Sequence, residues 1–128
     1  MCDRDPLPQW SFGRVTLLGD AAHPMYPVGS NGASQAVLDA RCVAGLLAEA
    51  NDVVTGLEAY EAARRPATTR IVEQNRAGGP ERVIDVVDER APDGFARLDE
   101  VASPSELEAI VRGYSRIAGF EQPRVTAR

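Results

Sequence analysis

One strand–loop–helix segment restricts what this chain can fold into more than any other feature. It begins with the apolar, partly β-branched run 15–18, which is typical of a buried strand and stops at Gly19 and Asp20. A stiff loop rich in proline and glycine follows and leads into a helix that opens on Gly32 and Ala33. A carboxylate at a strand end and unpaired N–H groups at a helix start then share one pocket. Such a pocket can accept a hydrogen bond from a sugar-like hydroxyl and face an electron-rich ring edge.

This segment resembles the second flavin-contacting motif of the FAD-dependent aromatic-ring monooxygenases, of the para-hydroxybenzoate and salicylate hydroxylase type. The resemblance rests on residues 19–24, which read Gly-Asp-Ala-Ala-His-Pro, and on Pro27, Gly29 and Gly32 after them. It is closest to the branch of flavin-dependent oxidoreductases that modify phenazines. Flanking stretches resemble the same branch, so the likeness covers nearly the whole chain; they are residues 3–8, Trp10, 60–66, 79–81 and 89–95.

The resemblance implies FAD as the cofactor and gives each matching residue a role. Asp20 binds a hydroxyl of the ribityl chain, while Pro27 and Gly29 lie against the flavin. Gly32 and Ala33 offer backbone N–H groups to the pyrimidine edge of the ring. The cofactor-binding residues that we expect are therefore Gly19, Asp20, Pro27, Gly29, Asn31, Gly32 and Ala33.

The same resemblance implies the reaction. NADH or NADPH reduces the flavin, which then reacts with oxygen, and one oxygen atom passes to a small, electron-rich aromatic substrate. Because the cofactor carries this chemistry, no catalytic triad is needed and no catalytic residue is assigned. Tyr26, beside the loop, is a candidate for touching the substrate and is otherwise a packing aromatic residue. The alternatives are a reductase, an epoxidase or a halogenase of the same FAD fold, or a non-enzymatic helical interaction module derived from one.

Two parts of such an enzyme are missing from the sequence. It contains no Gly-x-Gly-x-x-Gly turn to bind the pyrophosphate of the dinucleotide at a helix N-terminus. The middle sheet that forms much of the family's substrate chamber is absent too, and Met1 aligns with an interior position. We therefore expect the last third of an enzyme, which alone binds FAD weakly or not at all and is inactive. It would function within a longer polypeptide, beside a complementary N-terminal flavoprotein portion, or by self-association.

The expected fold is an α+β fragment of an FAD-binding α/β fold, mostly helical, in which one strand feeds the flavin loop and a helix. Residues 1–76 are expected to form the C-terminal portion of the FAD-binding domain, and residues 77–128 a C-terminal helical extension. Proline and glycine make residues 1–13 irregular. A lone strand is expected over residues 14–18, and frayed chain over 121–128.

The first helix is predicted over residues 32–49. Apolar residues recur there at spacings of three and four, which marks one face of a helix. Much of this face is alanine, which permits close approach to a sheet or to a cofactor. Its members are Ala33, Ala36, Val37, Ala40, Val43, Ala44 and Leu47.

The second helix is predicted from a capping box formed by Thr55 and Glu58. It extends to about residue 76. Pro66 removes a backbone donor and clashes with the preceding turn, so we expect a kink or a break there.

Two further helices are predicted. Residues 81–90 favour a helix, although their β-branched residues also suit a strand. Ser103 and Glu106 form a second capping box, with proline at the first helical position between them. The helix that starts there is expected to reach Ala118, and Gly119 is a natural C-terminal cap.

Composition restricts the class of partner. The formal net charge of −5 gives no reason to expect nucleic acid or an anionic membrane. No apolar run approaches membrane-spanning length and no secretion signal opens the chain, so we expect a cytoplasmic location. Cys2 and Cys42 do not indicate a disulfide framework. Three Phe, three Tyr and one Trp are few for an independent core.

The other polar residues have plainer interpretations. His23 is expected to shape the loop, and a metal site is not expected because no second His or Cys stands at ligand spacing. Ser30 and Ser34 have no local base, so nucleophilic catalysis has no support. The arginines of the second helix are expected to be solvated or paired with nearby glutamates; they are Arg64, Arg65 and Arg76, with Glu58, Glu61 and Glu73.

Overall fold

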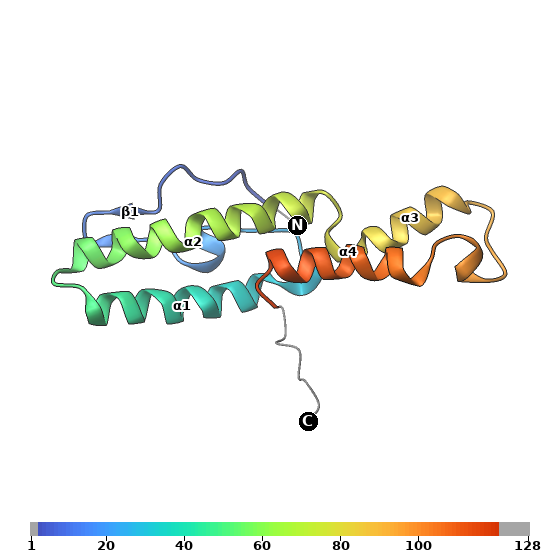
Figure 1. Ribbon diagram of the computed structural model, residues 1–128. Coiled ribbons are helices and arrows are strands. Elements are labelled where there is room, and N and C mark those ends of the chain that lie inside the picture. The colour runs from blue at the N-terminus through green and yellow to red at the C-terminus, as the bar shows by residue number, and fades with distance from the viewer. Residues whose placement is uncertain (1–2, 121–128) are drawn as a thin grey trace, which may run out of the picture.

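The computed structural model describes residues 3–120 and is mostly helical, as expected (Figure 1). The helices are α1 (Gly32–Glu49), α2 (Val53–Arg76), α3 (Arg82–Arg90) and α4 (Pro104–Ile117). The strands are β1 (Ser11–Phe12) and β2 (Val15–Thr16), and the short 3-10 turns are η1 (Gly19–Ala21), η2 (Val28–Ser30), η3 (Gly79–Glu81) and η4 (Leu98–Glu100). Among the described residues, no helix has the length and apolarity that crossing a membrane requires.

The strand prediction is wrong in both extent and isolation. β1 and β2 form an antiparallel hairpin, in which Phe12 pairs with Val15. The turn between them needs Gly13, whose φ of +59° is a conformation that other residues rarely adopt. The segment expected to be irregular therefore supplies the partner strand, and Val15, predicted to be buried, is 65% exposed.

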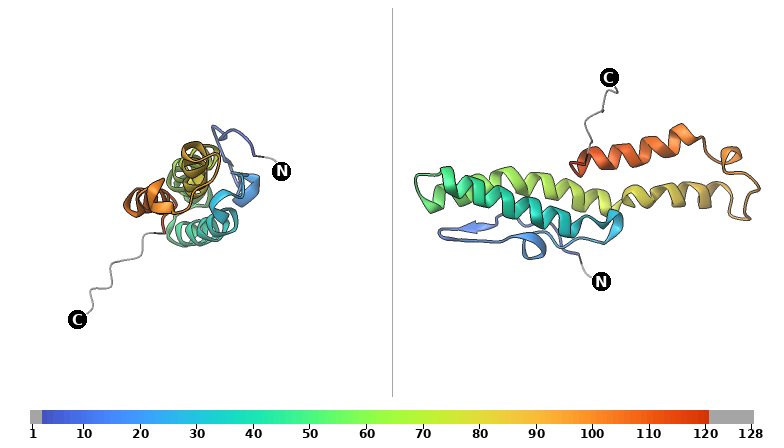
Figure 2. Two further views of the ribbon diagram at one scale, coloured as in Figure 1. Left: turned by 90° about the vertical axis from the view of Figure 1, so that its right-hand side faces the viewer. Right: turned by 90° about the horizontal axis from the view of Figure 1, so that it is seen from below.

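α1 and α2 lie side by side and run antiparallel (Figures 1 and 2). α1 has the predicted bounds, but α2 begins earlier than its predicted capping box. Its N-cap is Asp52, whose carboxylate accepts hydrogen bonds from the Thr55 backbone N–H at 3.1 Å and from the Thr55 hydroxyl at 2.6 Å. The carboxylate satisfies an N–H group that the first turn leaves unpaired, so the N-cap lies three residues before Thr55 and the helix begins at Val53.

The predicted break at Pro66 does not occur, because α2 continues through this residue. The proline ring lies on the exposed side of the helix. On the opposite side, Tyr60 before it and Thr68 and Ile71 after it are buried. Burial on both sides of the proline holds the two halves of the helix in line, and this outweighs the lost hydrogen bond.

The apolar face predicted for α1 is also wrong. Val37 is 69% exposed, and the fully buried residues of this helix are the polar pair Gln35 and Asp39. Val43 and Leu46 are only partly buried and pack against a small apolar cluster. The helix is turned so that its polar pair meets α2, and this leaves much of its alanine-rich stripe facing outward.

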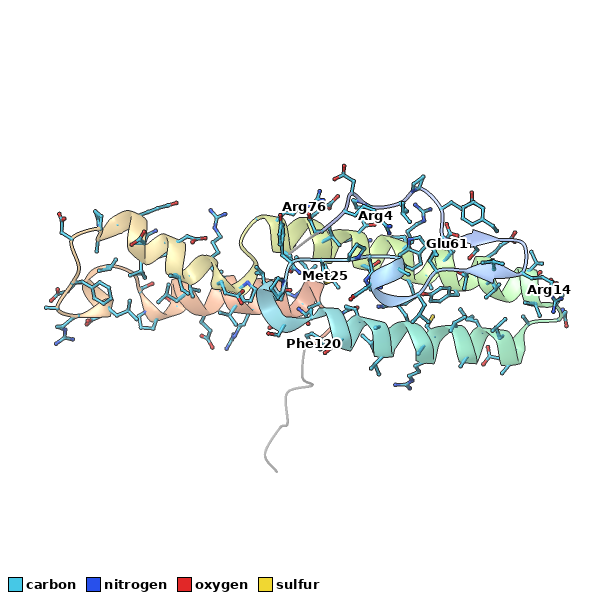
Figure 3. The ribbon with its side chains drawn as sticks, turned by 180° about the vertical axis from the view of Figure 1, so that it is seen from behind. Arg4, Arg14, Met25, Glu61, Arg76 and Phe120 are labelled. Carbon is cyan, nitrogen blue, oxygen red and sulfur yellow. The ribbon has the colours of Figure 1, made fainter. Side chains whose placement is uncertain are left out.

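The apolar cluster joins the N-terminal segment to the helix pair. Its fully buried members are Trp10, Ala22 and Tyr60, with the Trp10 and Tyr60 ring centroids 5.8 Å apart. The carboxylate of Glu61 fixes the same segment by accepting hydrogen bonds from the backbone N–H groups of Trp10 and Ser11 at 2.9 and 2.7 Å (Figure 3).

α3 and α4 form a second antiparallel pair that extends beyond the end of α2 (Figure 1). Residues 82–90 are helical rather than extended. Ser103 caps α4 as predicted, accepting a hydrogen bond from the Glu106 N–H at 3.2 Å. The C-terminal end of α4 returns to the start of α1, where the Gln35 amide donates to the Ala118 carbonyl at 3.1 Å. Cys42 is a free thiol, and Cys2 lies outside the described residues.

Candidate functional site

The loop between β2 and α1, together with the first two residues of α1, carries every residue of the predicted site. It begins at Gly19, which has a φ of +58° and is buried, and it passes through η1 and η2. It ends at Gly32, the first residue of α1. Met25 marks its middle in Figure 3, close to the start of α1.

A buried carboxylate holds the first half of this loop. Asp39 is 0% exposed and accepts hydrogen bonds from the Gly19 backbone N–H at 3.2 Å and from His23 Nε2 at 2.5 Å. Its other oxygen accepts from Arg64 Nε at 2.6 Å. Burial raises the pKa of Asp39, but the hydrogen bonds from His23 and Arg64 outweigh burial and hold this pKa below its usual range. The side chain is therefore an anion that ties the loop to both long helices.

This arrangement defines the state of His23. Since the Asp39 carboxylate is ionised, Nε2 carries the proton and donates it. Nδ1 is buried and has no hydrogen-bond partner among the described residues. The ring also lies 5.5 Å from that of Trp10. The imidazole is thus a buried part of the loop's framework.

The prediction that these arginines are solvated or paired with glutamates is confirmed for Arg65, holds for the exposed Arg76 and is wrong for Arg64. Arg65 pairs with Glu61 at 3.0 Å, as expected. Arg64 is neither solvated nor paired with a glutamate; it bonds to Asp39 and, through its second nitrogen, to the Gln35 amide oxygen at 2.7 Å. Arg76 pairs with two aspartates of the N-terminal segment rather than with Glu73; they are Asp3 and Asp5.

The second half of the loop is held from the other side. The backbone N–H of Gly29 donates to both oxygens of Glu81, at 2.9 and 3.1 Å. The Asn31 side chain donates to the Tyr114 hydroxyl at 2.6 Å, and that hydroxyl donates to Asn75 Oδ1, also at 2.6 Å. Asn31 is therefore buried, and its side chain is directed toward α4 rather than toward solvent.

The start of α1 consequently lacks the usual side-chain cap. Asn31 occupies the N-cap position, but its side chain makes no capping hydrogen bond. Nearby, the Asp20 carboxylate is exposed and bonds to no other described residue. A Cβ placed on Gly32 would lie 3.9 Å from Asp20 Oδ1, so the carboxylate and the helix start are neighbours. Together they present an acceptor and unpaired N–H donors to the same region.

The structure thus divides the predicted site residues into two groups. Asp20, Pro27 and Ala33 are exposed, and Tyr26 is 39% exposed, so these residues can meet a ligand. Gly29 and Gly32 are partly buried, and the backbone of Gly29 is already bonded. Gly19 and Asn31 are buried and bonded to Asp39 and Tyr114. In this second group only Asn31 has a side chain, and it is buried.

Sequence reasoning missed the residues that hold the loop in place. Asp39 carries a signal, since a carboxylate and Gln35 four residues before it interrupt an alanine-rich helix. No sequence signal indicates Glu81 or Tyr114, because they lie 52 and 83 residues from their loop partners.

Comparisons of this chain with a family model and with individual proteins agree with one another. The family model of the FAD binding domain matches residues 5–75. Phenazine 1,6-dicarboxylic acid hydroxylase PhzS of Lysobacter antibioticus is 64% identical over 76 residues, which are 59% of this chain and 19% of that protein. For 3-hydroxybenzoate 6-hydroxylase 1 of Aquipseudomonas alcaligenes the identity is 51% over 76 residues, again 59% of this chain and 19% of that protein.

A third relative matches further along the chain. 3-amino-4-hydroxybenzoate 2-monooxygenase PtmB3 of Streptomyces platensis is 39% identical over 128 residues, covering 98% of this chain and 30% of that protein. The chain therefore spans between 19% and 30% of the length of these relatives. Its similarity to PtmB3 extends through α3 and α4, beyond the residues that the family model matches.

Proposed function

This chain belongs to the FAD-dependent aromatic hydroxylase family, as the resemblance of its loop implies, and we propose on that premise that residues 19–33 contact the flavin of an NAD(P)H-using monooxygenase. The observation that carries this proposal is the exposed Asp20 carboxylate beside the uncapped N-terminus of α1. An acceptor for a polyol hydroxyl and unpaired donors for a ring edge are what the ribityl–isoalloxazine half of FAD requires.

The chain's own residues have distinct tasks in this proposal. Asp20 accepts a hydrogen bond from a ribityl hydroxyl. The N–H groups of Gly32 and Ala33 face the pyrimidine edge of the ring, where the dipole of α1 stabilises negative charge by about 0.3–2 kcal/mol. Pro27 and Gly29 lie along the ring.

The remaining predicted residues complete the site. Gly19 and Asn31 contribute by fixing the backbone, since their polar groups are bonded inward. Tyr26, which is 39% exposed, touches the substrate in this proposal. FAD, when bound, supplies the redox chemistry, taking electrons from a nicotinamide cofactor and activating oxygen for transfer to an aromatic ring.

We propose a small aromatic acid as the substrate. The names of the relatives support this class, because they refer to phenazine dicarboxylic acid, 3-hydroxybenzoate and 3-amino-4-hydroxybenzoate. The division into residues 1–76 of the FAD-binding domain and a helical extension over 77–128 is part of the same proposal. These 128 residues alone are expected to bind FAD weakly, since they include no glycine-rich turn for its pyrophosphate.

The test replaces the matching segment of PtmB3 with this chain and measures the flavin content and NAD(P)H oxidation of the purified chimera. Asp20→Ala removes one charge-assisted hydrogen bond, worth about 1.5–3 kcal/mol, so FAD affinity should fall about 10- to 100-fold. Asp88→Ala removes an exposed aspartate on α3, remote from the loop, and should leave affinity unchanged. Equal affinity in the two variants would remove Asp20 from the site. A chimera that folds but binds no flavin would refute the proposed function.

A further inference from the structure

The second half of the flavin loop is held by residues outside the segment that matches the FAD binding domain. That match ends at residue 75, whereas Glu81 follows in η3 and Tyr114 lies in α4. The C-terminal end of α4 lies beside the start of α1, and Phe120 marks this end in Figure 3. The helical extension is therefore in direct contact with the loop proposed to bind flavin.

Glu81 fixes the backbone at Gly29. Both of its carboxylate oxygens lie within hydrogen-bond distance of the single Gly29 N–H, at 2.9 and 3.1 Å. A charged acceptor makes this bond stronger than one between neutral groups. The chain of η3 also lies close to the loop, because a Cβ on Gly79 would meet Val28 Cγ1 at 2.4 Å.

Tyr114 connects both ends of the loop. Its side chain is only 7% exposed. The hydroxyl accepts from Asn31 and donates to Asn75, and the Asn75 amide donates in turn to the Tyr26 carbonyl at 3.1 Å. Burial raises the pKa of Tyr114, the hydrogen bond from Asn31 opposes this, and the nearby Glu81 charge adds to it, so the phenol stays protonated and remains a donor.

The loop conformation between these contacts is strained. Gly29 has a φ of +69°, and Ser30 has a φ of +52°, the only positive φ of a non-glycine residue in the part of the chain that the structure describes. The Tyr114 ring is packed directly on Gly29, where a Cβ would lie 2.5 Å from the hydroxyl oxygen. Strained backbone persists where surrounding contacts over-determine it.

We propose that Tyr114 and Glu81 are positioning residues for flavin binding, which hold residues 26–31 in the conformation that presents Pro27, Gly29 and the start of α1 to the ring. This inference rests on the proposed function, and it assigns the helical extension a direct part in it. The consequence is that the loop, and with it flavin affinity, responds to changes in α4 and η3 that never touch the flavin.

The test measures amide hydrogen exchange of residues 26–33 in the 128-residue chain without FAD, and in the PtmB3 chimera with and without added FAD. Tyr114→Phe keeps the ring but removes the hydroxyl with its contacts to Asn31, Asn75 and the Val28 carbonyl. Glu81→Ala removes the acceptor for the Gly29 N–H. Each should raise exchange in the loop at least tenfold while exchange in the middle of α2 stays unchanged. Glu81→Gln keeps an acceptor oxygen and should restore most of the protection. Glu108→Ala, which breaks only the surface pair with Arg112, is the matched control and should change nothing.

The outcomes separate this inference from the proposed function. The inference is overturned if the variants' loop exchanges as slowly as that of the unchanged chain, or if exchange rises equally throughout the molecule. Both results are obtained without flavin. In the chimera, Tyr114→Phe should also raise at least tenfold the FAD concentration that is needed to protect the loop. Faster loop exchange with no change in that FAD concentration would overturn the role in flavin binding. If FAD protects the loop of the unsubstituted chimera at no concentration, the proposed function fails at this loop, and the role in flavin binding falls with it.

Discussion

Replacing Asp39 of α1 by alanine should destabilise the fold strongly, because this residue holds the first half of the loop. The substitution leaves three donors without their acceptor: the Gly19 N–H, His23 Nε2 and Arg64 Nε. Removing one partner of a buried ion pair costs about 3–5 kcal/mol, since the other charge is left uncompensated. Small domains have about 5–15 kcal/mol of stability in total. Asp39→Ala is therefore expected to remove about 3–5 kcal/mol, a large share of the whole.

The assay is urea unfolding followed by tryptophan fluorescence. Trp10 is the single tryptophan and its ring lies against that of His23, so it reports on the packing that Asp39 fixes. Asp99→Ala is the control, because Asp99 pairs only with exposed Arg97, and a surface pair contributes about 0–1 kcal/mol. A loss below about 1 kcal/mol for Asp39→Ala, or a loss equal to that of the control, would refute the reasoning.

The same carboxylate should make stability depend on acid. Its pKa is lower in the folded chain than in the unfolded one, so the folded state holds fewer protons at this group. The stabilisation is therefore complete above the unfolded pKa of about 4 and is lost as the pH falls through the folded value. Asp39→Asn should be less stable at neutral pH and should lose less stability below about pH 4. Parallel pH profiles for the two chains would contradict the assignment of an ionised Asp39.

Two backbone predictions can be checked by the same unfolding assay. Ser30→Gly should raise the free energy of unfolding by about 0.5–1 kcal/mol, because relief of a left-handed serine, about 1–2 kcal/mol, exceeds the added entropy of glycine in the unfolded chain; a loss of stability would show that Ser30 is not strained. Pro66→Ala should stabilise the chain by up to about 3 kcal/mol, since the ring is exposed and interrupts the bonding of α2; no gain would mean that the proline's restriction of the unfolded chain offsets its cost.

Helix bounds could be predicted where the determinants are local. α1 begins and ends where apolar spacing and Gly32 indicated, and the capping box at Ser103 marks the start of α4. The buried face of α1 could not be predicted from the sequence, because it depends on the contact between Asp39 and Arg64, which lies 25 residues later on another helix. The hairpin partner of β2 was missed for a related reason, since one glycine in left-handed conformation makes the turn and apolar spacing does not reveal it.

The candidate site also has a part that the sequence predicts and a part that it does not. Resemblance to a known motif identified Asp20 and the glycines, because these residues lie within one short segment of the sequence. Glu81 and Tyr114 are single polar residues in amphipathic surroundings, and nothing in the spacing around them distinguishes them from solvated side chains. Their partners became evident only once the returning α4 placed them against the loop.

In the proposed site, the backbone N–H groups offered to the flavin are those of Gly32 and Ala33, so other groups must hold the loop in place. Here side chains from elsewhere provide the attachment: Asp39 holds the loop at Gly19, and Glu81 and Tyr114 hold it at Gly29 and Asn31. The clearest case is Asn31, which occupies the capping position of α1 yet bonds to Tyr114 instead. In the proposed site, a capping Asn31 would satisfy N–H groups of the first helical turn, and these groups could then not bind the flavin. Its diversion to α4 keeps those donors free, and this links the helical extension to the electrostatics of the site as well as to its shape.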